Sequence, residues 1–174
     1  MEKYNPIYSV GIEELDLQNY EEVLDFLKKN KIRKIIHLGW KMENNNKAIY
    51  DNIEALNNLL KASEEVQVEK IIFTSTNNVY GTELNGNNFS EEDKINLDEN
   101  NKYGISKYLG EELVKYSMNE KACIIRIADV YGPNQNHGNL MKGIISNLEN
   151  KKNIQLYGEG KRERDYIYID DVIR

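Results

Sequence analysis

Short apolar segments that alternate with amphipathic segments are the feature that most constrains the fold of this chain. Residues 34–38 (KIIHL), 70–75 (KIIFTS) and 122–127 (ACIIRI) are short and rich in β-branched residues. Buried strands of parallel sheets have this composition, and helical connections then cover the sheet on both faces. The order of the segments therefore predicts a single domain of α/β class, with a parallel sheet between helices.

Helical periodicity fills the intervals between these strands. Residues 19–30 place their apolar residues on one face, and Asn19 followed by Glu22 resembles a capping box. The stretch 82–102 has no sustained period and is rich in Asn, Asp and Glu, so we expect a loop or a lid there. Further helices are expected at 47–66, 103–119 and 138–150, and further short strands at 153–157 and 166–169.

Charge and composition exclude several classes of protein. The net charge is −6 and no block of Lys or Arg occurs, which argues against nucleic acid and anionic membranes as partners. No segment has the length of a membrane span and no signal peptide is evident, so a cytoplasmic location is expected. Cys123 lies in an apolar run and is interpreted as a core residue, as is His37. The spacing of His37 and His137 does not predict a metal site.

Polar and small residues follow the predicted strands at the point where each one ends. Gly39 and Trp40 follow the first strand, Thr76 and Asn77 the second, and Asp129 the third. Ligands of parallel α/β sheets bind beyond the carboxyl ends of the strands. The residues at this edge of the sheet are therefore expected to form a site.

Tyr103 and Lys107 begin the helix expected at 103–119, one turn apart. Residues i and i+4 share a helix face, so the ammonium would lie near the phenol and lower its pKa from about 10. Such a pair can act as a general acid and base, with a hydroxyl from Thr76 or Ser75 beside it. An isolated Tyr-x-x-x-Lys is more often an ordinary surface pair, and the neighbouring strand ends favour the catalytic interpretation here.

Taken together, these segments resemble the extended short-chain dehydrogenase/reductase family, in its NAD-dependent epimerase/dehydratase branch. The resemblance covers almost the whole chain and consists of seven segments in family order. They are DLQN (16–19), IIHLGW (35–40), NIEALNNLL (52–60), FTSTNNVYG (73–81), YGISK (103–107), RIADVYGP (126–133) and GEGKRERDYIYIDDV (158–172).

The resemblance implies a role for each matching residue. Tyr103 would exchange the substrate proton, Lys107 would hold the nicotinamide ribose, and Thr76 would bond the reacting oxygen. NAD would be the cofactor, with NADP not excluded. The residues implied to line the cofactor are Asp16, Leu17, Leu38, Gly39, Asn52, Ser75, Tyr103 and Lys107. Those implied to bind the substrate are Thr76, Asn77, Asn78, Asp129 and Arg164, the last through a diphosphate.

The glycine fingerprint of this family, G-x-x-G-x-x-G, is not found in the sequence; Gly11 stands alone. The expectation is a Rossmann-like, doubly wound sheet that lacks the first β-α-β unit, in a chain truncated at both ends. Residues 1–174 would be a partial NAD(P)-binding domain, and 154–174 the start of the substrate-binding region. Without the fingerprint's backbone amides, NAD is expected to bind weakly.

Two local departures bear on the reaction. Family dehydratases carry Asp-Glu after the catalytic Thr, whereas this chain carries Asn77 and Asn78, which cannot serve as general acid and base. That difference favours a nucleotide-sugar 4-epimerase. A one-way reductase or dehydrogenase of the same family, and a non-catalytic, cofactor-deficient fragment, are the alternatives. Asp129 replaces the usual Asn, and its carboxylate would either repel a substrate diphosphate or cap the next turn.

An unpaired edge of the predicted sheet bears on whether the chain forms oligomers. Without the family's first strands, residues 34–38 would form a sheet edge with unpaired backbone groups. A second copy of the chain could pair with that edge, residues 7–12 could fold over it, or the chain could fold poorly alone. Self-association is favoured, because family members commonly dimerise through helices that correspond to 47–66 and 103–119. A homodimer is therefore expected.

Overall fold

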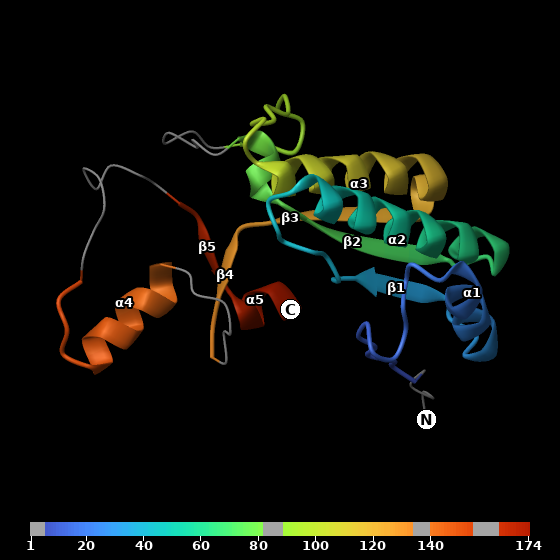
Figure 1. Ribbon diagram of the computed structural model, residues 1–174, viewed down its shortest axis with the longest axis horizontal. Helices are drawn as coiled ribbons and strands as arrows, with labels where there is room; N and C mark the ends of the chain where they lie inside the picture. Colours follow the sequence, from blue (N-terminus) through green and yellow to red (C-terminus); the bar gives the residue numbers. More distant parts are fainter. Residues whose placement is uncertain (1–5, 82–88, 134–139, 155–163) are drawn as a thin grey trace.

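Parallel strands under a layer of helices form the main body of the computed structural model, which describes residues 6–81, 89–133, 140–154 and 164–174. The strands are β1 (Lys34–His37), β2 (Lys70–Thr76) and β3 (Ala122–Ile127), hydrogen-bonded in the order β1-β2-β3. Helices α2 (Asn46–Glu65) and α3 (Lys102–Met118) lie side by side on one face of this sheet (Figure 1). The α/β class and the parallel pairing predicted from the sequence are confirmed.

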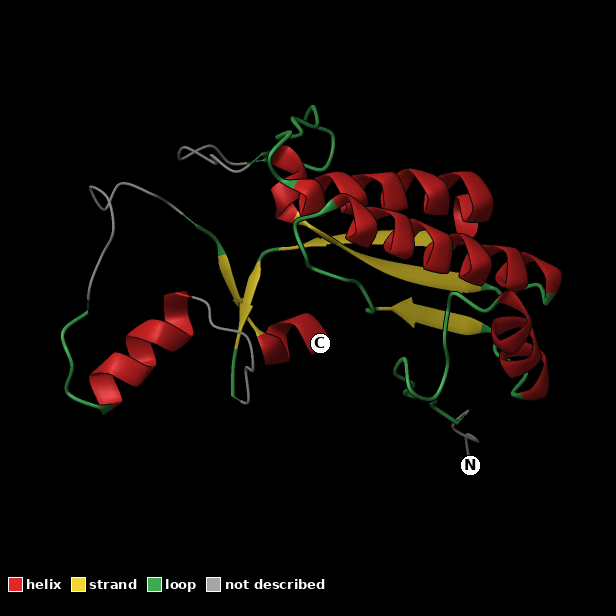
Figure 2. Cartoon of the chain, viewed as in Figure 1, coloured by secondary structure: helices red, strands yellow, loops and turns green. Residues whose placement is uncertain are grey.

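Among the remaining helices, α1 and α4 agree with the predicted periodicity, whereas α5 was not predicted. Helix α1 (Tyr20–Lys29) packs against α2, and α4 (Leu140–Glu149) and α5 (Ile169–Ile173) lie towards the C-terminus (Figure 2). Two short 3₁₀ helices follow β2 and α3, at Asn77–Tyr80 and Asn119–Lys121. At the start of α1, the Asn19 side chain accepts a hydrogen bond from the Glu22 amide, as the capping box predicts.

The hydrophobic core lies between the sheet and the helical layer. Its members are apolar residues of the helices and the sheet, among them Val23, Leu27, Leu56, Leu60, Ile71, Phe73 and Val114. In the sheet, Thr76 pairs with Ile127, so β2 and β3 end together, and β1 ends at the same edge with His37 paired to Phe73. That edge carries the residues predicted to form the site.

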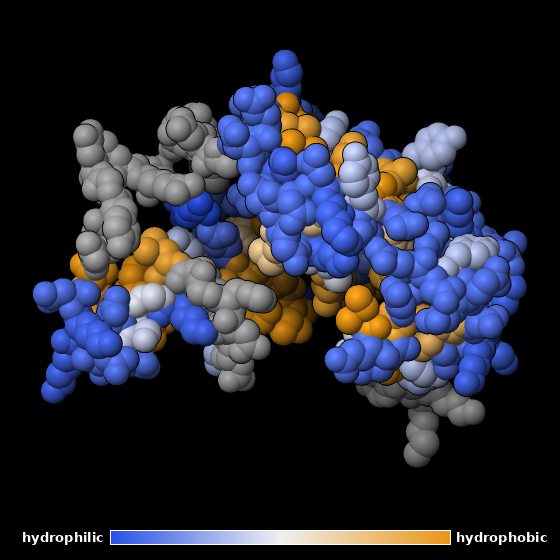
Figure 3. Space-filling model, viewed as in Figure 1, coloured by the Kyte–Doolittle hydropathy of each residue, from blue (hydrophilic) through white to orange (hydrophobic). Residues whose placement is uncertain are grey.

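The prediction that helices cover both faces of the sheet is wrong for the described residues. Ile36 and Ile125, on the face opposite α2 and α3, have exposed fractions of 64% and 42%, and Leu38 one of 68%. Figure 3 shows orange, hydrophobic side chains gathered below the helical layer, near the centre of the molecule. Two right-handed crossovers that step in the same direction place both of their helices on the same face, which explains the asymmetry.

A second, two-stranded parallel sheet follows the main one. Strand β4 (Asp129–Tyr131), which the sequence did not predict, pairs with β5 (Tyr166–Tyr168), which it did. Residues 89–101 form a loop, as expected, whereas 82–88 lie outside the described residues. Of the strand predicted at 153–157, residues 153 and 154 are not in a strand and the others lie outside the described residues.

The β1 edge has no further strand partner within the described residues. β1 pairs with β2 alone, and residues 7–12 form coil and turn. The alternative in which residues 7–12 pair with this strand is therefore not found. No helix in the described parts of the chain is both long and apolar enough to cross a membrane.

Candidate active site at the carboxyl edge of the sheet

Thr76 and the two asparagines after it form a tight turn at the end of β2. The Thr76 hydroxyl accepts a hydrogen bond from the Asn78 amide at 3.2 Å and contacts the Asn77 side-chain oxygen at 3.5 Å. Thr76 thereby caps the 3₁₀ helix that carries both asparagines. The three residues predicted to bind substrate at this point do lie together.

The first turn of α3 packs closely on this turn. A Cβ at Gly104 would lie 3.0 Å from the Asn78 carbonyl oxygen and 2.7 Å from the Asn101 side chain, so glycine permits the approach. Asn101 caps the helix by accepting from the Gly104 amide at 3.0 Å. Tyr103 is thus held beside the Thr76 turn by the backbone of both elements, and the structure brings these two predicted catalytic residues to one edge.

The phenol of Tyr103 is in a different state from the predicted one. Its hydroxyl has no hydrogen-bond partner among the described residues, and burial raises its pKa above 10. The one-turn spacing of Tyr103 and Lys107 predicted a lowered pKa for this phenol. That direction is wrong in this arrangement, because the Lys107 ammonium is directed elsewhere.

Lys107 points into the core. Its Nζ donates to the Thr74 carbonyl oxygen at 2.5 Å and lies 4.5 Å from the centre of the Trp40 ring. Only 3% of Lys107 is exposed, and burial lowers its pKa to about 8 against the raising effect of Glu111. Lys107 and Tyr103 share a helix face, but the ammonium makes no hydrogen bond to the phenol. The long lysine side chain instead contacts the Thr74 carbonyl in the sheet and the Trp40 ring.

A buried polar network lies directly behind the turn, and the sequence analysis missed it. Glu111 is fully buried, accepts from Ser75 Oγ at 2.5 Å and forms a two-bond pair with Arg126 at 2.9 and 2.7 Å. Arg126 also donates to the Tyr80 hydroxyl at 2.6 Å, and these bonds raise the Arg126 pKa. Ser75, predicted to line the cofactor, belongs to this network. The position of Glu111 on the buried face of α3, four residues after Lys107, is the signal that could have revealed it.

The other residues predicted to line the cofactor divide into two groups. Leu38 is exposed at the edge, and a Cβ at Gly39 would meet no atom within 4 Å, so this part of the backbone is open. Asn52, in contrast, is buried and bonds both the amide and the carbonyl of Lys41, at 2.8 and 2.9 Å. Asn52 therefore holds the loop after β1 in place.

Asp16 and Leu17 lie on the loop before α1. The Asp16 carboxylate accepts from the Gln18 amide at 2.9 Å, and its charge acts on the ammonium of Lys41. The Leu17 side chain packs against the core, and its carbonyl oxygen accepts from Asn58 of α2 at 3.1 Å. These two residues are near the loop after β1 but make no contact with Tyr103 or Thr76 among the bonds described.

Asp129 and Arg164 form an ion pair just past the same edge. The Arg164 Nη1 to Asp129 Oδ2 distance is 3.0 Å, and each side chain is about one third exposed. The Asp129 amide also donates to the Asp165 carbonyl at 3.2 Å, so the β4–β5 pairing places the two side chains together. Neither predicted effect of Asp129, repulsion of a ligand or capping of a turn, accounts for this contact.

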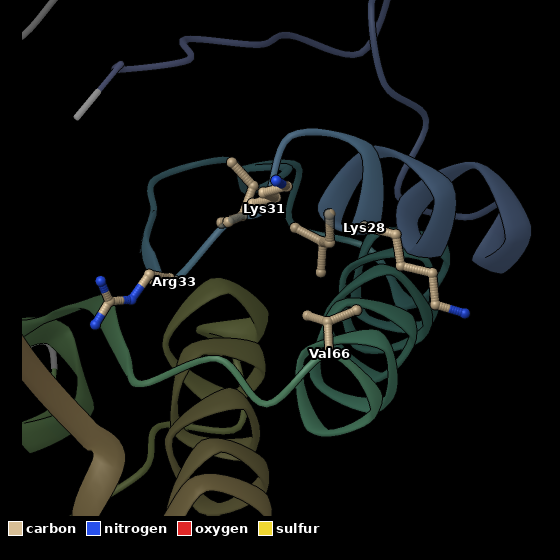
Figure 4. Close-up of a pocket in the computed structure, with 6 residues that line it drawn as sticks. Lys28, Lys31, Arg33 and Val66 are labelled. Carbon is tan, nitrogen blue, oxygen red and sulfur yellow. The ribbon is translucent and has the colours of Figure 1, made fainter.

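A shallow pocket lies at the opposite, amino edge of the sheet and takes no part in this arrangement. It is lined by Leu27, Lys28, Lys31, Ile32, Arg33 and Val66 (Figure 4). Two of its cations are already paired, Lys28 with Glu65 and Arg33 with Glu69. Within the described parts of the chain, no group of His, Cys, Asp and Glu residues could hold a metal ion.

Comparison with known proteins shows which family this chain matches. The sequence model of the NAD dependent epimerase/dehydratase family matches residues 2–174. A dTDP-D-glucose 4,6-dehydratase of Dictyostelium discoideum is 31% identical over 176 residues, which cover 91% of this chain and 40% of that protein. A protein of Bacillus subtilis (strain 168) named an uncharacterized UDP-glucose epimerase is 32% identical over 126 residues, 71% of this chain and 39% of that protein.

Solved structures share the fold. The UDP-glucose 4-epimerase of Thermotoga maritima, solved with UDP-glucose, gives a TM-score of 0.77 at 24% identity, covering 90% of this chain and 54% of that one. The dTDP-glucose 4,6-dehydratase of Bacillus anthracis, solved with NAD, gives 0.78 at 22% identity, covering 90% and 50%. The chain thus spans about half the length of the proteins it matches. With a Rossmann-like fold and a family match from residue 2 to residue 174, this chain belongs to the NAD-dependent epimerase/dehydratase family of enzymes.

Proposed function

We propose that this chain carries the acid–base site of a nucleotide-sugar 4-epimerase, with Tyr103, Lys107 and Thr76 as its catalytic residues. The observation that carries the proposal is the Tyr103 phenol, which has no hydrogen-bond partner among the described residues and whose neighbour Gly104 packs against the turn after Thr76. A free phenol and a strand-end hydroxyl at one edge can address the same substrate oxygen.

NAD is the cofactor of this family, and the residues of this edge have the chemical groups needed to bind its nicotinamide half. Tyr103 and Lys107 supply a hydroxyl and an ammonium, and the backbone at Gly39 is open to a ligand. The Lys107 ammonium uses one of its three N–H groups on the Thr74 carbonyl, so the other two could donate to a ribose hydroxyl. When bound, NAD⁺ supplies a hydride acceptor.

The side chains would then move one proton. Ionised Tyr103 would take the proton of the sugar 4-hydroxyl while Thr76 Oγ1 donates a hydrogen bond to the same oxygen. To donate it, the Thr76 hydroxyl turns away from Asn77 Oδ1, a contact of only 3.5 Å. After the keto sugar has rotated in the site, Tyr103 would return the proton to the same oxygen. Because burial raises the Tyr103 pKa, an approaching ammonium is needed to favour the phenolate near neutral pH.

The two asparagines favour epimerisation over dehydration. Asn77 and Asn78 occupy the places at which family dehydratases carry an acidic pair, and neither amide can exchange a proton with the substrate. A one-way reductase or dehydrogenase of the same family would use the same three residues. The non-catalytic alternative has one specific observation in its favour, namely the burial of Lys107 in the core.

The proposal includes the nucleotide-sugar substrate, with Arg164 near its diphosphate, and a cytoplasmic location. It also keeps Asn77, Asn78 and Asp129 as substrate contacts. Asp129 begins β4, two residues after β3 ends, and Arg164 lies two residues before β5, which pairs with β4. Their position beyond the strand ends supports a role in holding the part of the ligand that does not react.

The assay is the interconversion of UDP-galactose and UDP-glucose by the purified chain with NAD⁺. We expect Tyr103→Phe to reduce turnover by about 10²- to 10⁴-fold, since it removes the general acid and base. Tyr116→Phe is the matched control, because Tyr116 lies on the same helix and is 90% exposed. Equal rates for the two variants would reject the proposal.

A further inference from the structure

The Lys107 ammonium sits in a cage of aromatic rings. Nζ lies 4.5 Å from the centre of the Trp40 ring and 5.0 Å from that of Phe73, and it donates to the Thr74 carbonyl oxygen. His37 stacks on Phe73 at 5.9 Å and meets Trp40 edge-on at 6.0 Å. A cation over aromatic faces is attracted most strongly where water is excluded. The cage therefore stabilises Lys107 at the Thr74 carbonyl, where the ammonium makes no hydrogen bond to the Tyr103 hydroxyl.

Trp40 is fixed in this cage by several independent contacts. Its Nε1 donates to Ser106 Oγ at 3.0 Å, and Ser106 in turn donates to the Tyr103 carbonyl oxygen at 2.9 Å. Asn52 holds the backbone of Lys41, the next residue in the chain. Glycine at position 110 leaves the space, because a Cβ there would lie 2.9 Å from Trp40 Cη2 and 2.7 Å from Phe73 Cζ.

We propose that Trp40 is a positioning residue that holds the Lys107 ammonium away from Tyr103, and that the catalytic pair forms only when the indole releases it. The inference rests on the proposed roles of Tyr103 and Lys107. It adds a movement of the Lys107 side chain, which the Tyr-x-x-x-Lys spacing alone does not predict. The step needs no new group in the site, only a change of partner for the lysine.

The charges around Lys107 agree with this assignment. Glu111, from its own helix, lies on the side away from Tyr103 and is already paired with Arg126 of β3. Buried His37, from β1, has its pKa lowered to about 4 by burial and by Lys107, so it is neutral near pH 7. The Tyr103 phenol has a pKa raised by burial alone. No phenolate therefore competes with the cage for the ammonium.

The test measures the Tyr103 pKa directly, by ¹³C NMR of the chain labelled at the tyrosine Cζ, with the signal assigned from Tyr103→Phe. In Trp40→Leu, which removes the aromatic face, we expect the freed ammonium to lower the Tyr103 pKa by about 1 unit or more. Trp40→Phe keeps a ring over the ammonium and should leave that pKa near its original value. The ε-methylene of Lys107 gives a second signature, because protons above an aromatic ring resonate upfield of those of exposed Lys115.

A double variant separates the lysine from simple opening of the site to water. In Trp40→Leu/Lys107→Met the fall in the Tyr103 pKa should disappear, whereas water entry would preserve it. Ser106→Ala loosens the indole without removing it and replaces Trp40→Leu if the latter does not fold. An unshifted Lys107 methylene in the unaltered chain, an unchanged Tyr103 pKa on release of the indole, or a fall that persists in the double variant would each overturn the inference. None of these readouts depends on turnover, so the result is separate from that of the epimerase assay.

Discussion

At the scale of single residues, the chemistry of a side chain depends more on the group that it contacts than on its residue type. Asp129 illustrates this, because the sequence offers only a carboxylate where family members have an amide. In the structure this carboxylate is paired with Arg164, so the guanidinium proposed to bind a diphosphate already has an anionic partner. A ligand phosphate would have to displace Asp129 and would then meet its negative charge.

Asp129→Asn should therefore strengthen the binding of UDP. We expect an affinity about fivefold higher, equivalent to about 1 kcal/mol, which is near the upper end for a partly exposed ion pair. Isothermal titration at two salt concentrations is the measurement. Asp171→Asn is the control, since Asp171 of α5 also pairs with an arginine, Arg174, just after that helix. Unchanged or weaker binding of UDP by Asp129→Asn would show that the pair does not restrict the phosphate site.

At the scale of elements, β1 carries a buried histidine into the helical side of the sheet. His37 is 5% exposed, stacks on Phe73 and has its pKa lowered from 6.5 to about 4, mainly by burial. The interpretation of His37 as a core residue is confirmed. Because the unfolded chain binds a proton near pH 6.5 and the folded chain only near pH 4, protonation favours the unfolded state between these values.

The free energy of unfolding should consequently fall as the pH is lowered from 6.5 to 4. His37 alone accounts for up to about 3 kcal/mol of that loss, from its shift in pKa. Urea unfolding at a series of pH values would show a smaller slope for His37→Gln than for the unaltered chain. The same substitution at His137 is the control. Equal slopes for the His37 variant and the unaltered chain would mean that His37 is not buried as a neutral ring.

At the scale of the whole molecule, the exposed apolar side chains of the described residues include some on the open sheet face and some on the helical layer. The open sheet face exposes Ile36, Leu38 and Ile125, and the outer side of the helical layer exposes Tyr50 and Tyr116. The β1 edge adds backbone groups that no described strand pairs with. We therefore keep the homodimer as a proposal, with the helical layer and the sheet edge as the two candidate contacts.

Light scattering across a concentration range should show self-association of the purified chain. Ile36→Lys places a charge on the open sheet face, and Tyr116→Lys places one on the helical layer; the variant that lowers the mass identifies the contact. Ile173→Lys alters an exposed residue of α5 and is the control. A monodisperse monomer whose amides at 34–37 are protected from hydrogen exchange would contradict self-association.

The elements of this fold were readable from the sequence because their signals are local. A β-branched run, a 3.6-residue period and a capping asparagine act within a few residues, so β1, α1 and α3 appear close to where they were predicted. Strand β4 was missed because a three-residue strand has almost no period, and only its pairing with β5 defines it. The covering of one sheet face alone could not be seen either, since it depends on the direction in which successive crossovers step.

The sequence by itself determined the family, the parallel sheet, and the edge that carries Tyr103 and Thr76, because motif order and strand ends are properties of the chain. Only the tertiary structure decided what each polar side chain contacts. Lys107 and Tyr103 are one helical turn apart, yet the ammonium binds the Thr74 carbonyl and the Trp40 ring instead. Helical spacing fixes the position of the backbone from which a long side chain extends. The position of its charged group depends on the strongest partner within reach, which is often distant in sequence.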